Sequence, residues 1–264
     1  MHNSPSNKRP LAASDTAPVD VSDATTAPVN GANMLAFGCN DAGQCAVEGG
    51  DDEYAISTPS PARPLSGGAI VTHVAFGASH AVWLSSEGAV YTMGENSHGE
   101  CGMSLPSDVV RTPTRLESLA QSYTAVDLAV GAAHTVVITA GGAAFSFGQN
   151  DLGQCGLGAG AELDVRRPKL VKHQQHVLQA SCGDQHTLLL DSSAQVLSCG
   201  SGRFGALGVS SATGSQPTPT PVSTLETCPV RQVAAAGRHS VALTYGGAVL
   251  AWGYVQRNPE NSVY

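Results

Sequence analysis

Residues 181–190, Ser-Cys-Gly-Asp-Gln-His-Thr-Leu-Leu-Leu, join a Gly-x-x-His motif to a short run of apolar residues. The same shape occurs three more times in this chain of 264 residues, and the four histidines are 54, 52 and 53 residues apart. They are His80, His134, His186 and His239. Regular spacing of this kind is typical of solenoids and propellers, in which one unit recurs because it cannot bury its apolar face alone. The chain is therefore predicted to be a repeat protein.

A second motif has the same spacing. Residues 37–45, Phe-Gly-Cys-Asn-Asp-Ala-Gly-Gln-Cys, are similar to residues 93–101 and 147–155 and more weakly to residues 199–207, and the motif begins again at residue 252. The first glycines of these segments are 56, 54, 52 and 53 residues apart. Two independent motifs that recur at the same interval predict successive units. These units begin near residues 35, 91, 145 and 197, and a fifth is truncated near residue 250.

The apolar pattern between the motifs is typical of short β-strands. Residues 81–84, Ala-Val-Trp-Leu, precede a polar turn at residues 85–88 and a second apolar run at residues 89–93. Such runs, joined by short Gly or Ser turns, predict antiparallel hairpins. A strand before each histidine and another at each Thr-Pro or Arg-Pro signal bring the number to three or four per unit, and proline places the last of them at a sheet edge. This pattern predicts a propeller blade.

The two motifs together resemble the repeat of the regulator of chromosome condensation (RCC1) family. Residues 181–190 fit the family pattern best, and the resemblance covers residues 35–253. It implies an all-β, RCC1-like β-propeller. Because the family propeller usually has seven blades, we expect an incomplete one here, with about four blades of short antiparallel strands. The fourth unit departs from the pattern at Gly202, Ala206 and Ala236.

Composition divides the chain into two parts. Residues 1–33 are rich in Pro, Ser and Ala, contain no run of large apolar residues, and are predicted to be a disordered tail. Residues 34–264 are predicted to form the RCC1-like repeat domain. No apolar stretch has the length of a signal peptide core or of a membrane span. We therefore expect an intracellular protein, cytoplasmic or nuclear, without a membrane partner.

Charge and cysteine content narrow the functional classes. The net charge is −8 and no basic run follows Lys8 and Arg9, so direct binding to nucleic acid is not expected. The seven cysteines form no Cys-x-x-Cys pair. Cys45, Cys101 and Cys155 occupy one equivalent position in three units, which predicts a small buried core position rather than a disulfide or zinc site.

The repeated histidines and glycine loops are predicted to be structural. Neighbouring sheets pack about 10 Å apart, so equivalent histidines do not converge on one metal ion, and each imidazole is expected to bond nearby backbone. The loops lack the Gly-x-x-x-x-Gly-Lys-Ser pattern of phosphate binding. No serine lies in a Gly-x-Ser-x-Gly context. We therefore expect no catalytic residue, no metal and no cofactor.

Binding specificity in repeat folds lies on residues that differ between units. The two residues before each repeated histidine vary in this way. The predicted partner-binding residues are Ser79, Asp184, Gln185 and Arg238. The resemblance implies that such loops face a small GTPase in the family member that exchanges nucleotide on Ran, where acidic and histidine side chains assist exchange.

Three functions remain open. The first is a non-catalytic protein–protein interaction module that presents variable loops on a propeller. The second is a guanine nucleotide exchange factor for a Ran-like small GTPase, although the similar spacer lengths show no inserted wedge hairpin. The third is a propeller fragment of a larger regulatory protein such as a ubiquitin ligase. An open arc of sheets also predicts self-association through its unpaired edge strands.

Overall fold

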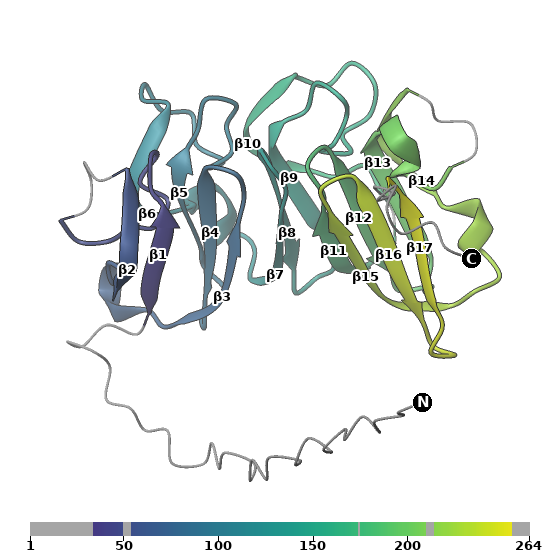
Figure 1. Cartoon of the computed structure of the whole chain (residues 1–264), viewed down its shortest axis with the longest axis horizontal. Helices are drawn as coiled ribbons and strands as arrows, with labels where there is room; N and C mark the ends of the chain where they lie inside the picture. The colour runs from purple at the N-terminus through teal and green to yellow at the C-terminus, as the bar shows by residue number, and fades with distance from the viewer. Residues whose placement is uncertain (1–33, 50–53, 174, 210–213, 255–264) are drawn as a thin grey trace, which may run out of the picture.

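The computed structural model describes residues 34–49, 54–173, 175–209 and 214–254. The predicted tail, residues 1–33, lies outside the described residues. The described chain is mostly β-structure and forms five antiparallel sheets that follow one another in a row (Figure 1). The N-terminal and C-terminal sheets lie at opposite ends of this row. The prediction of an all-β, incomplete propeller is therefore confirmed.

Three of the sheets have four strands each, and we name them blades 1, 2 and 3. Blade 1 contains β3 (Val71–Phe76), β4 (His80–Ser85), β5 (Val90–Glu95) and β6 (Val109–Arg115). Blade 2 contains β7 (Ala125–Val130), β8 (His134–Thr139), β9 (Ala144–Gln149) and β10 (Asp164–Leu170). Blade 3 contains β11 (Val177–Cys182), β12 (His186–Asp191), β13 (Val196–Ser201) and β14 (Ser215–Pro221). Each blade is a simple meander in sequence order.

The two end sheets are partial blades. The N-terminal sheet contains β1 (Leu35–Cys39) and β2 (Ala55–Pro61). The C-terminal sheet contains β15 (Val230–Ala236), β16 (His239–Thr244) and β17 (Val249–Gly253). The short helices are η3 (Ser66–Gly68), α1 (Glu117–Ala120), η4 (Arg203–Gly205) and η5 (Ser223–Leu225). Among the residues that the structure describes, no helix has the length and apolar character needed to cross a membrane.

The sheets are offset from the sequence units. Residues 91, 145 and 197 lie in the third strands β5, β9 and β13, so each unit begins in one sheet and ends on the second strand of the next. By the same alignment, β1 and β2 correspond to the third and fourth strands of a blade. The fourth strands are the sheet edges, as predicted from Pro113 in β6 and Pro168 in β10, because proline donates no ladder hydrogen bond.

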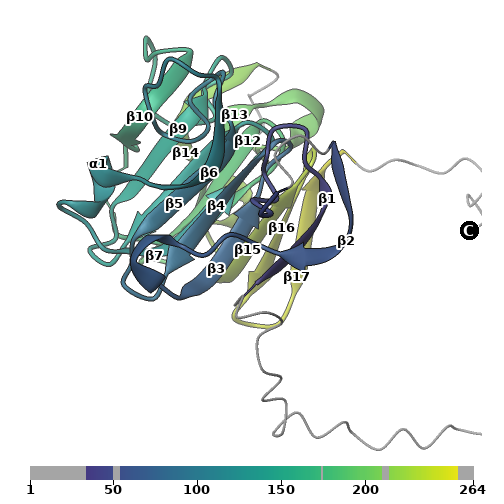
Figure 2. The same ribbon diagram turned by 90° about the vertical axis from the view of Figure 1, so that its left-hand side faces the viewer.

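The core lies between successive sheets rather than within one. Four clusters of buried apolar side chains fill the four interfaces of the row. Figure 2 looks along the row from the N-terminal sheet and shows the sheets one behind another. Cys45, Cys101 and Cys155 are buried and free, as the sequence predicts. Burial raises the pKa of the Cys101 and Cys155 thiols, which makes them poor nucleophiles.

A polar relay crosses three of these interfaces. His134 Nε2 lies 2.9 Å from the hydroxyl of Thr187 in the next blade, and this hydroxyl donates to the carbonyl of Gln154 at 2.8 Å. Because the hydroxyl proton is used in that bond, the hydroxyl oxygen accepts from the imidazole, which places the proton of the neutral ring on Nε2. The equivalent pairs are His80 with Thr135 (3.0 Å) and His186 with Ser240 (2.9 Å). The prediction that each imidazole bonds nearby backbone is therefore wrong, because its partner is a side-chain hydroxyl group of the next sheet.

The glycine of each Gly-x-x-His motif makes room for the imidazole. A Cβ atom added at Gly131 would lie 2.2 Å from His134 Cε1, so no other residue fits without displacing the ring. In the C-terminal sheet this position is Ala236, and His239 is exposed rather than buried. The relay therefore ends at Ser240, and the departure of the fourth unit from the pattern has a direct structural consequence.

The buried histidines make stability depend on pH. Burial lowers the pKa of His134 to about 3 and those of His80 and His186 to about 4, from the ordinary value of 6.5. Only the unfolded chain takes up protons between these values, so the stabilisation is complete above about pH 6.5 and is lost as the pH falls. We expect the free energy of unfolding, measured by urea titration, to decrease steeply between pH 7 and pH 5.

The variant His134→Asn tests this origin. It removes one titrating group, so the slope of the unfolding free energy against pH should be smaller by up to about 1.4 kcal/mol per pH unit. His239→Asn is the matched control, because the equivalent side chain is exposed, and it should keep the wild-type slope. An unchanged slope in His134→Asn would contradict the assignment.

Candidate functional site

Two sets of loops differ in sequence between the units: those between the first and second strands, and those that follow the third strands. Both sets lie at one end of the sheets, which we call the upper face from its position in Figure 1. The second strand of each blade begins where the third strand ends, and His80 pairs with Gly94. The amide of Glu95 donates to the carbonyl of Ser79 at 2.8 Å. The same bond recurs from Gln149, Ser201 and Tyr254 to Ala133, Gln185 and Arg238. The residue that follows the first glycine of the second motif, as Glu95 follows Gly94, is thus a further variable position on this face. It was not predicted from the sequence.

Three of the four predicted partner-binding residues meet in one hollow of the upper face. Asp184, Gln185 and Arg238 line it together with two further side chains, Arg203 and Phe204. They come from three loops: the β11–β12 loop, η4 after β13, and the β15–β16 loop. We call this the upper hollow. It lies where blade 3 meets the C-terminal sheet.

The side chains of the upper hollow are arranged around Phe204. The guanidinium carbon of Arg238 lies 4.9 Å from the centroid of the Phe204 ring, within the range of a cation–π contact. Tyr254 packs against the same ring edge-on, with 5.0 Å between the centroids. The amide of Asp184 donates to the carbonyl of Gly237 at 2.8 Å, which joins two of the loops. No carboxylate of the described chain forms an ion pair with Arg203 or Arg238.

The departures of the fourth unit explain this hollow. In the regular loop, Asn150 Oδ1 accepts from the Cys155 amide at 3.1 Å and Gln154 Oε1 accepts from the Leu152 amide at 2.9 Å. Gly202 and Ala206 replace the asparagine and the glutamine and so remove both bonds. The loop becomes the single turn η4, in which Phe204 has a φ of +61° and is half-exposed.

Left-handed backbone is costly for a bulky residue, so Phe204 is held in a strained and exposed position. The sequence already contained the signal, because residues 202–206 depart from the repeat. Reading that departure as simple degeneracy missed Arg203 and Phe204.

Ser79 lies apart from the upper hollow. It belongs to the β3–β4 loop of blade 1, near the other end of the row. Its carbonyl accepts from the backbone amide of Glu95, and Ser79 does not line the upper hollow. The structure therefore brings three of the four predicted residues together and leaves the fourth outside.

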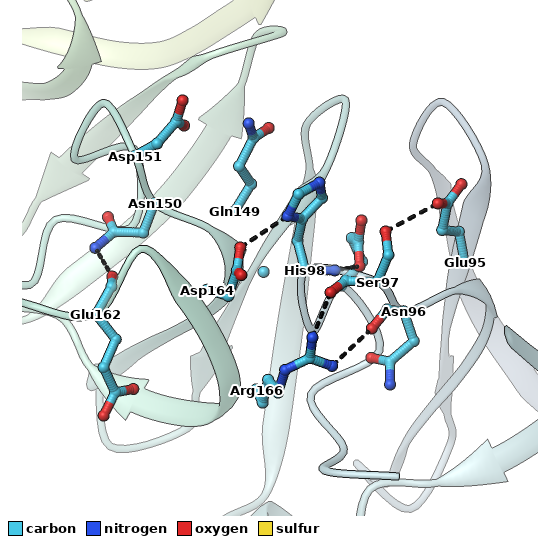
Figure 3. Close-up of polar contacts among 12 residues, drawn as sticks. Glu95, Asn96, Ser97, His98, Gln149, Asn150, Asp151, Glu162, Asp164 and Arg166 are labelled. Atoms are coloured by element: carbon cyan, nitrogen blue, oxygen red, sulfur yellow. Dashed lines mark hydrogen bonds and ion pairs between the residues drawn. The ribbon is translucent and has the colours of Figure 1, made fainter. Parts of the chain in front are cut away.

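The acidic part of the upper face joins blades 1 and 2 (Figure 3). His98 Nδ1 lies 2.7 Å from Asp164 Oδ1, and Ser97 donates to Glu95 at 2.9 Å. Arg166 donates to the carbonyls of Asn96 and Ser97. The hydrogen bond that His98 donates to Asp164 raises the pKa of His98, with smaller contributions from neighbouring carboxylates. These contacts form a second connection between the blades, at the surface.

The groups available at the upper face are charged, polar and aromatic. The repeated histidines behind it are buried, apart from His239, and burial lowers the pKa values of His80, His134 and His186. Within the described residues, no group of three or more His, Cys, Asp or Glu side chains is placed to hold a metal ion. The accessible groups include arginine, aromatic, amide and carboxylate side chains and the partly exposed His98.

Two protein-family models match this chain, and both describe the same repeat. The family model described as the regulator of chromosome condensation (RCC1) repeat matches residues 87–138, 141–190 and 193–243. A second model of the same repeat matches residues 71–100, 125–154 and 177–206. The two models divide the repeat at different places. Each match of the first model begins in one sheet and ends in the next, whereas each match of the second model begins at the first strand of a blade.

Curated relatives include much longer proteins. The chain is 31% identical over 195 residues to the human probable E3 ubiquitin-protein ligase HERC6, which covers 71% of this chain and 18% of that protein. It is 37% identical over 181 residues to mouse E3 ubiquitin-protein ligase HERC2, or 67% of this chain and 4% of that protein. It is 35% identical over 172 residues to the mouse secretion-regulating guanine nucleotide exchange factor, or 64% of this chain and 36% of that protein. The chain thus spans well under half the length of each.

Solved structures agree on the fold. Human WBSCR16 superposes with a TM-score of 0.71 at 22% identity, covering 83% of this chain and 56% of that one. Yeast RCC1 (Prp20), from its complex with Kap60, superposes with a TM-score of 0.65 at 22% identity, covering 77% of this chain and 48% of that one. The described sheets therefore correspond to about half of these propellers.

The surface pair of His98 and Asp164 is expected to respond to pH in the opposite sense to the buried histidines. Because the pKa of His98 is raised, its stabilisation is present at low pH and is lost as the pH rises through that raised value. Both side chains are partly exposed, so water screens the pair and limits its coupling to below about 1 kcal/mol.

A double-mutant cycle with His98→Ala and Asp164→Ala, measured by urea unfolding, should show a coupling energy at pH 5.5 that disappears at pH 8.5. The ion pair of Arg115 and Glu117, 3.5 Å apart, contains no histidine and is the control. Equal coupling of His98 and Asp164 at both pH values would contradict the assignment.

Proposed function

We propose that this chain, which belongs to the regulator of chromosome condensation (RCC1) repeat family, is a non-catalytic protein–protein interaction module that binds its partner through the upper face. The observation that carries this proposal is the upper hollow, where three loops bring Asp184, Gln185 and Arg238 together with Arg203 and Phe204. The remaining blades act as a stiff frame. We place the protein inside the cell, in the cytoplasm or the nucleus.

Arginine and aromatic residues support an interaction role for the upper hollow. They are enriched among the residues that dominate binding energy at protein interfaces. Stacking on Phe204 holds Arg238 in place, so little side-chain entropy is lost when a partner binds. Neither Arg238 nor Arg203 has an ion-pair partner in the described chain. A partner surface with carboxylates opposite these two arginines fits this arrangement.

The second candidate is exchange of guanine nucleotide on a Ran-like small GTPase. It is favoured by the 35% identity to the mouse secretion-regulating guanine nucleotide exchange factor and by the position of Asp184 on the upper face. In this case the upper face would bind the GTPase and stabilise its nucleotide-free state. Such activity is regulatory and needs no covalent chemistry in this chain.

The third candidate is substrate selection within a ubiquitin ligase. The identity to HERC6 and HERC2 supports it, since this chain matches 18% and 4% of those proteins and the remaining parts would perform ligation. The interaction role of the upper face is the same in this setting. The difference is that the bound partner would then be a substrate of the ligase.

Charge reversal in the upper hollow tests the main proposal. Partners that bind the tagged wild-type chain are identified by mass spectrometry, and the affinity of each is then measured with purified proteins. Arg238→Glu and Phe204→Ala are expected to weaken binding at least about tenfold, since both residues lie in the centre of the hollow. Tyr245→Ala, on the exposed β16–β17 turn away from the upper face, is the control. Binding that survives both hollow variants would contradict the proposal.

Exchange activity is tested directly by release of labelled GDP from Ran. If this chain is an exchange factor, the wild type accelerates release, and Asp184→Ala reduces the acceleration at least about tenfold, whereas Tyr245→Ala, on the exposed β16–β17 turn away from the upper face, leaves it unchanged. Asp184→Asn retains the size of the side chain and separates loss of charge from loss of contact. No acceleration by the folded wild-type protein would exclude exchange on Ran and leave the interaction proposal standing.

A further inference from the structure

The edge of β1 opposite β2 has no partner strand in the described chain. The third strands β5, β9 and β13 each pair with a neighbour on both edges, whereas β1 pairs only with β2 in the described chain. Leu35 and Phe37 on β1 are 44% and 66% exposed. Their counterparts on the other third strands are all buried: Tyr91 and Met93, Phe145 and Phe147, and Leu197 and Cys199. The N-terminal sheet therefore presents an apolar surface that the fold elsewhere covers.

Gly38 shows the shape of the missing part. At Gly94, an added Cβ atom would lie 2.4 Å from the carbonyl oxygen of Ser79, because the Gly-x-x-His loop of the same blade lies against it. Gly148 and Gly200 meet the corresponding loops in the same way. Gly38 has the same left-handed backbone, with a φ of +115°, but an added Cβ would meet nothing within 4 Å. The vacant place fits a hairpin of the repeat's own first and second strands.

The C-terminal sheet has the complementary vacancy. The hairpin β15–β16 is a first and second strand, and β17 is its third strand, but the described chain contains no fourth. The sequence of β17 is nearly that of β1: residues 250–253 are Leu-Ala-Trp-Gly and residues 35–38 are Leu-Ala-Phe-Gly. Gly253 lies against the carbonyl of Arg238, the contact that Gly38 lacks. Because β1 carries β2 with it, β1–β2 would complete on β15–β16 the four-stranded blade that β17 leaves unfinished.

We propose that two copies of this chain exchange these elements, so that β1–β2 of each copy replaces β17 on the β15–β16 hairpin of the other. Each copy then contributes three whole blades and two halves, and the dimer closes as a ring of eight blades. Propellers of four to eight blades are known and leave only short, protected sheet edges, and a closed two-fold assembly completes both partial blades of each copy.

Two features favour a second copy over a contact within one chain. The N-terminal and C-terminal sheets lie at opposite ends of the row, so they cannot meet in the same molecule (Figure 1). The strand residues 35–39 and 249–253 carry no charged side chain, so neither edge has the lysine or glutamate that usually prevents pairing of edge strands. In the dimer, Phe37 and Leu35 would take the places of Trp252 and Leu250 against blade 3.

The new junction would lack the polar relay. In the ring, His239 of one copy is followed by blade 1 of the other, where the relay position after His80 is Ala81 rather than threonine or serine. The other three interfaces have Thr135, Thr187 and Ser240 at this position. The exchange is therefore expected to be reversible and to depend on protein concentration.

Sedimentation of the whole chain over a range of concentrations tests the proposal. We expect a reversible monomer–dimer equilibrium. Phe37→Asp should weaken dimerisation at least about 100-fold, because a carboxylate would replace an apolar side chain in the new interface. It should not unfold the monomer, in which Phe37 is exposed. Leu163→Asp, at a residue that is 65% exposed and outside both end sheets, is the matched control and should leave dimerisation unchanged.

Two further measurements distinguish exchange from ordinary association. Ala81→Thr combined with Ala236→Gly supplies both the hydroxyl group and the room for the His239 imidazole, and should tighten the dimer roughly 2- to 10-fold, the effect of one hydrogen bond, whereas Ala81→Thr alone should not. Trp252, whose Nε1 donates to the carbonyl of Ala206 at 2.9 Å, leaves this site on exchange, so its fluorescence should shift to longer wavelength as dimers form. Trp83 is buried in blade 1 and serves as the constant background.

Several outcomes would overturn the proposal. They are a chain that stays monomeric at several hundred micromolar, oligomers that continue to grow beyond dimers, and a dimer that is unaffected by Phe37→Asp. A monomer that instead binds a synthetic peptide of residues 177–191 would show that the vacant place takes a hairpin from another source. None of these results depends on the upper face, so they leave the proposed function untouched.

Discussion

The structure depends on a hydrogen-bond relay from each buried histidine through a hydroxyl group to a carbonyl of the preceding loop. A propeller blade has apolar side chains on both faces, and apolar contact alone does not fix how far one blade slides over the next. The relay fixes the position of each blade on the next, because it joins His80, His134 and His186 to buried hydroxyl groups 55, 53 and 54 residues away. Loss of one partner would leave a buried polar group unsatisfied, which costs more than the bond contributes.

The same relay gives a physical reason for the proposed recognition role of the upper face. The loops that carry the histidines and the loops that supply the carbonyls lie at one end of every blade, so the rigid part of the molecule is directly beneath them. The residues between the fixed positions are free to vary without disturbing the frame. In the fourth unit the variation extends to the fixed positions themselves, and the loop is rebuilt around Phe204. The most irregular part of the repeat is therefore the part with the most distinctive surface.

The fold and part of the candidate site could be predicted from the sequence, but from different signals. The Gly-x-x-His spacing, the turn residues and the edge prolines are local signals, and they identified the blades and the buried cysteines correctly. Asp184, Gln185 and Arg238 were predicted because they vary at a fixed position of the repeat, and the structure places them around one hollow. Arg203 and Phe204 were missed because their role depends on a left-handed backbone and on packing against Arg238, 34 residues from Phe204 in sequence, which no periodicity reveals.

By itself, the sequence determined that short antiparallel strands recur in step and must stack to bury their apolar faces, because strand period, turn chemistry and repeat spacing are all written locally. Only the tertiary structure decided which side chains are covered. Leu35 and Phe37 have the same sequence context as buried residues on β5 and β9, yet they are exposed, because burial depends on whether a neighbouring sheet is present. The hydroxyl partners of the histidines were also beyond the sequence pattern, since they lie one whole blade away.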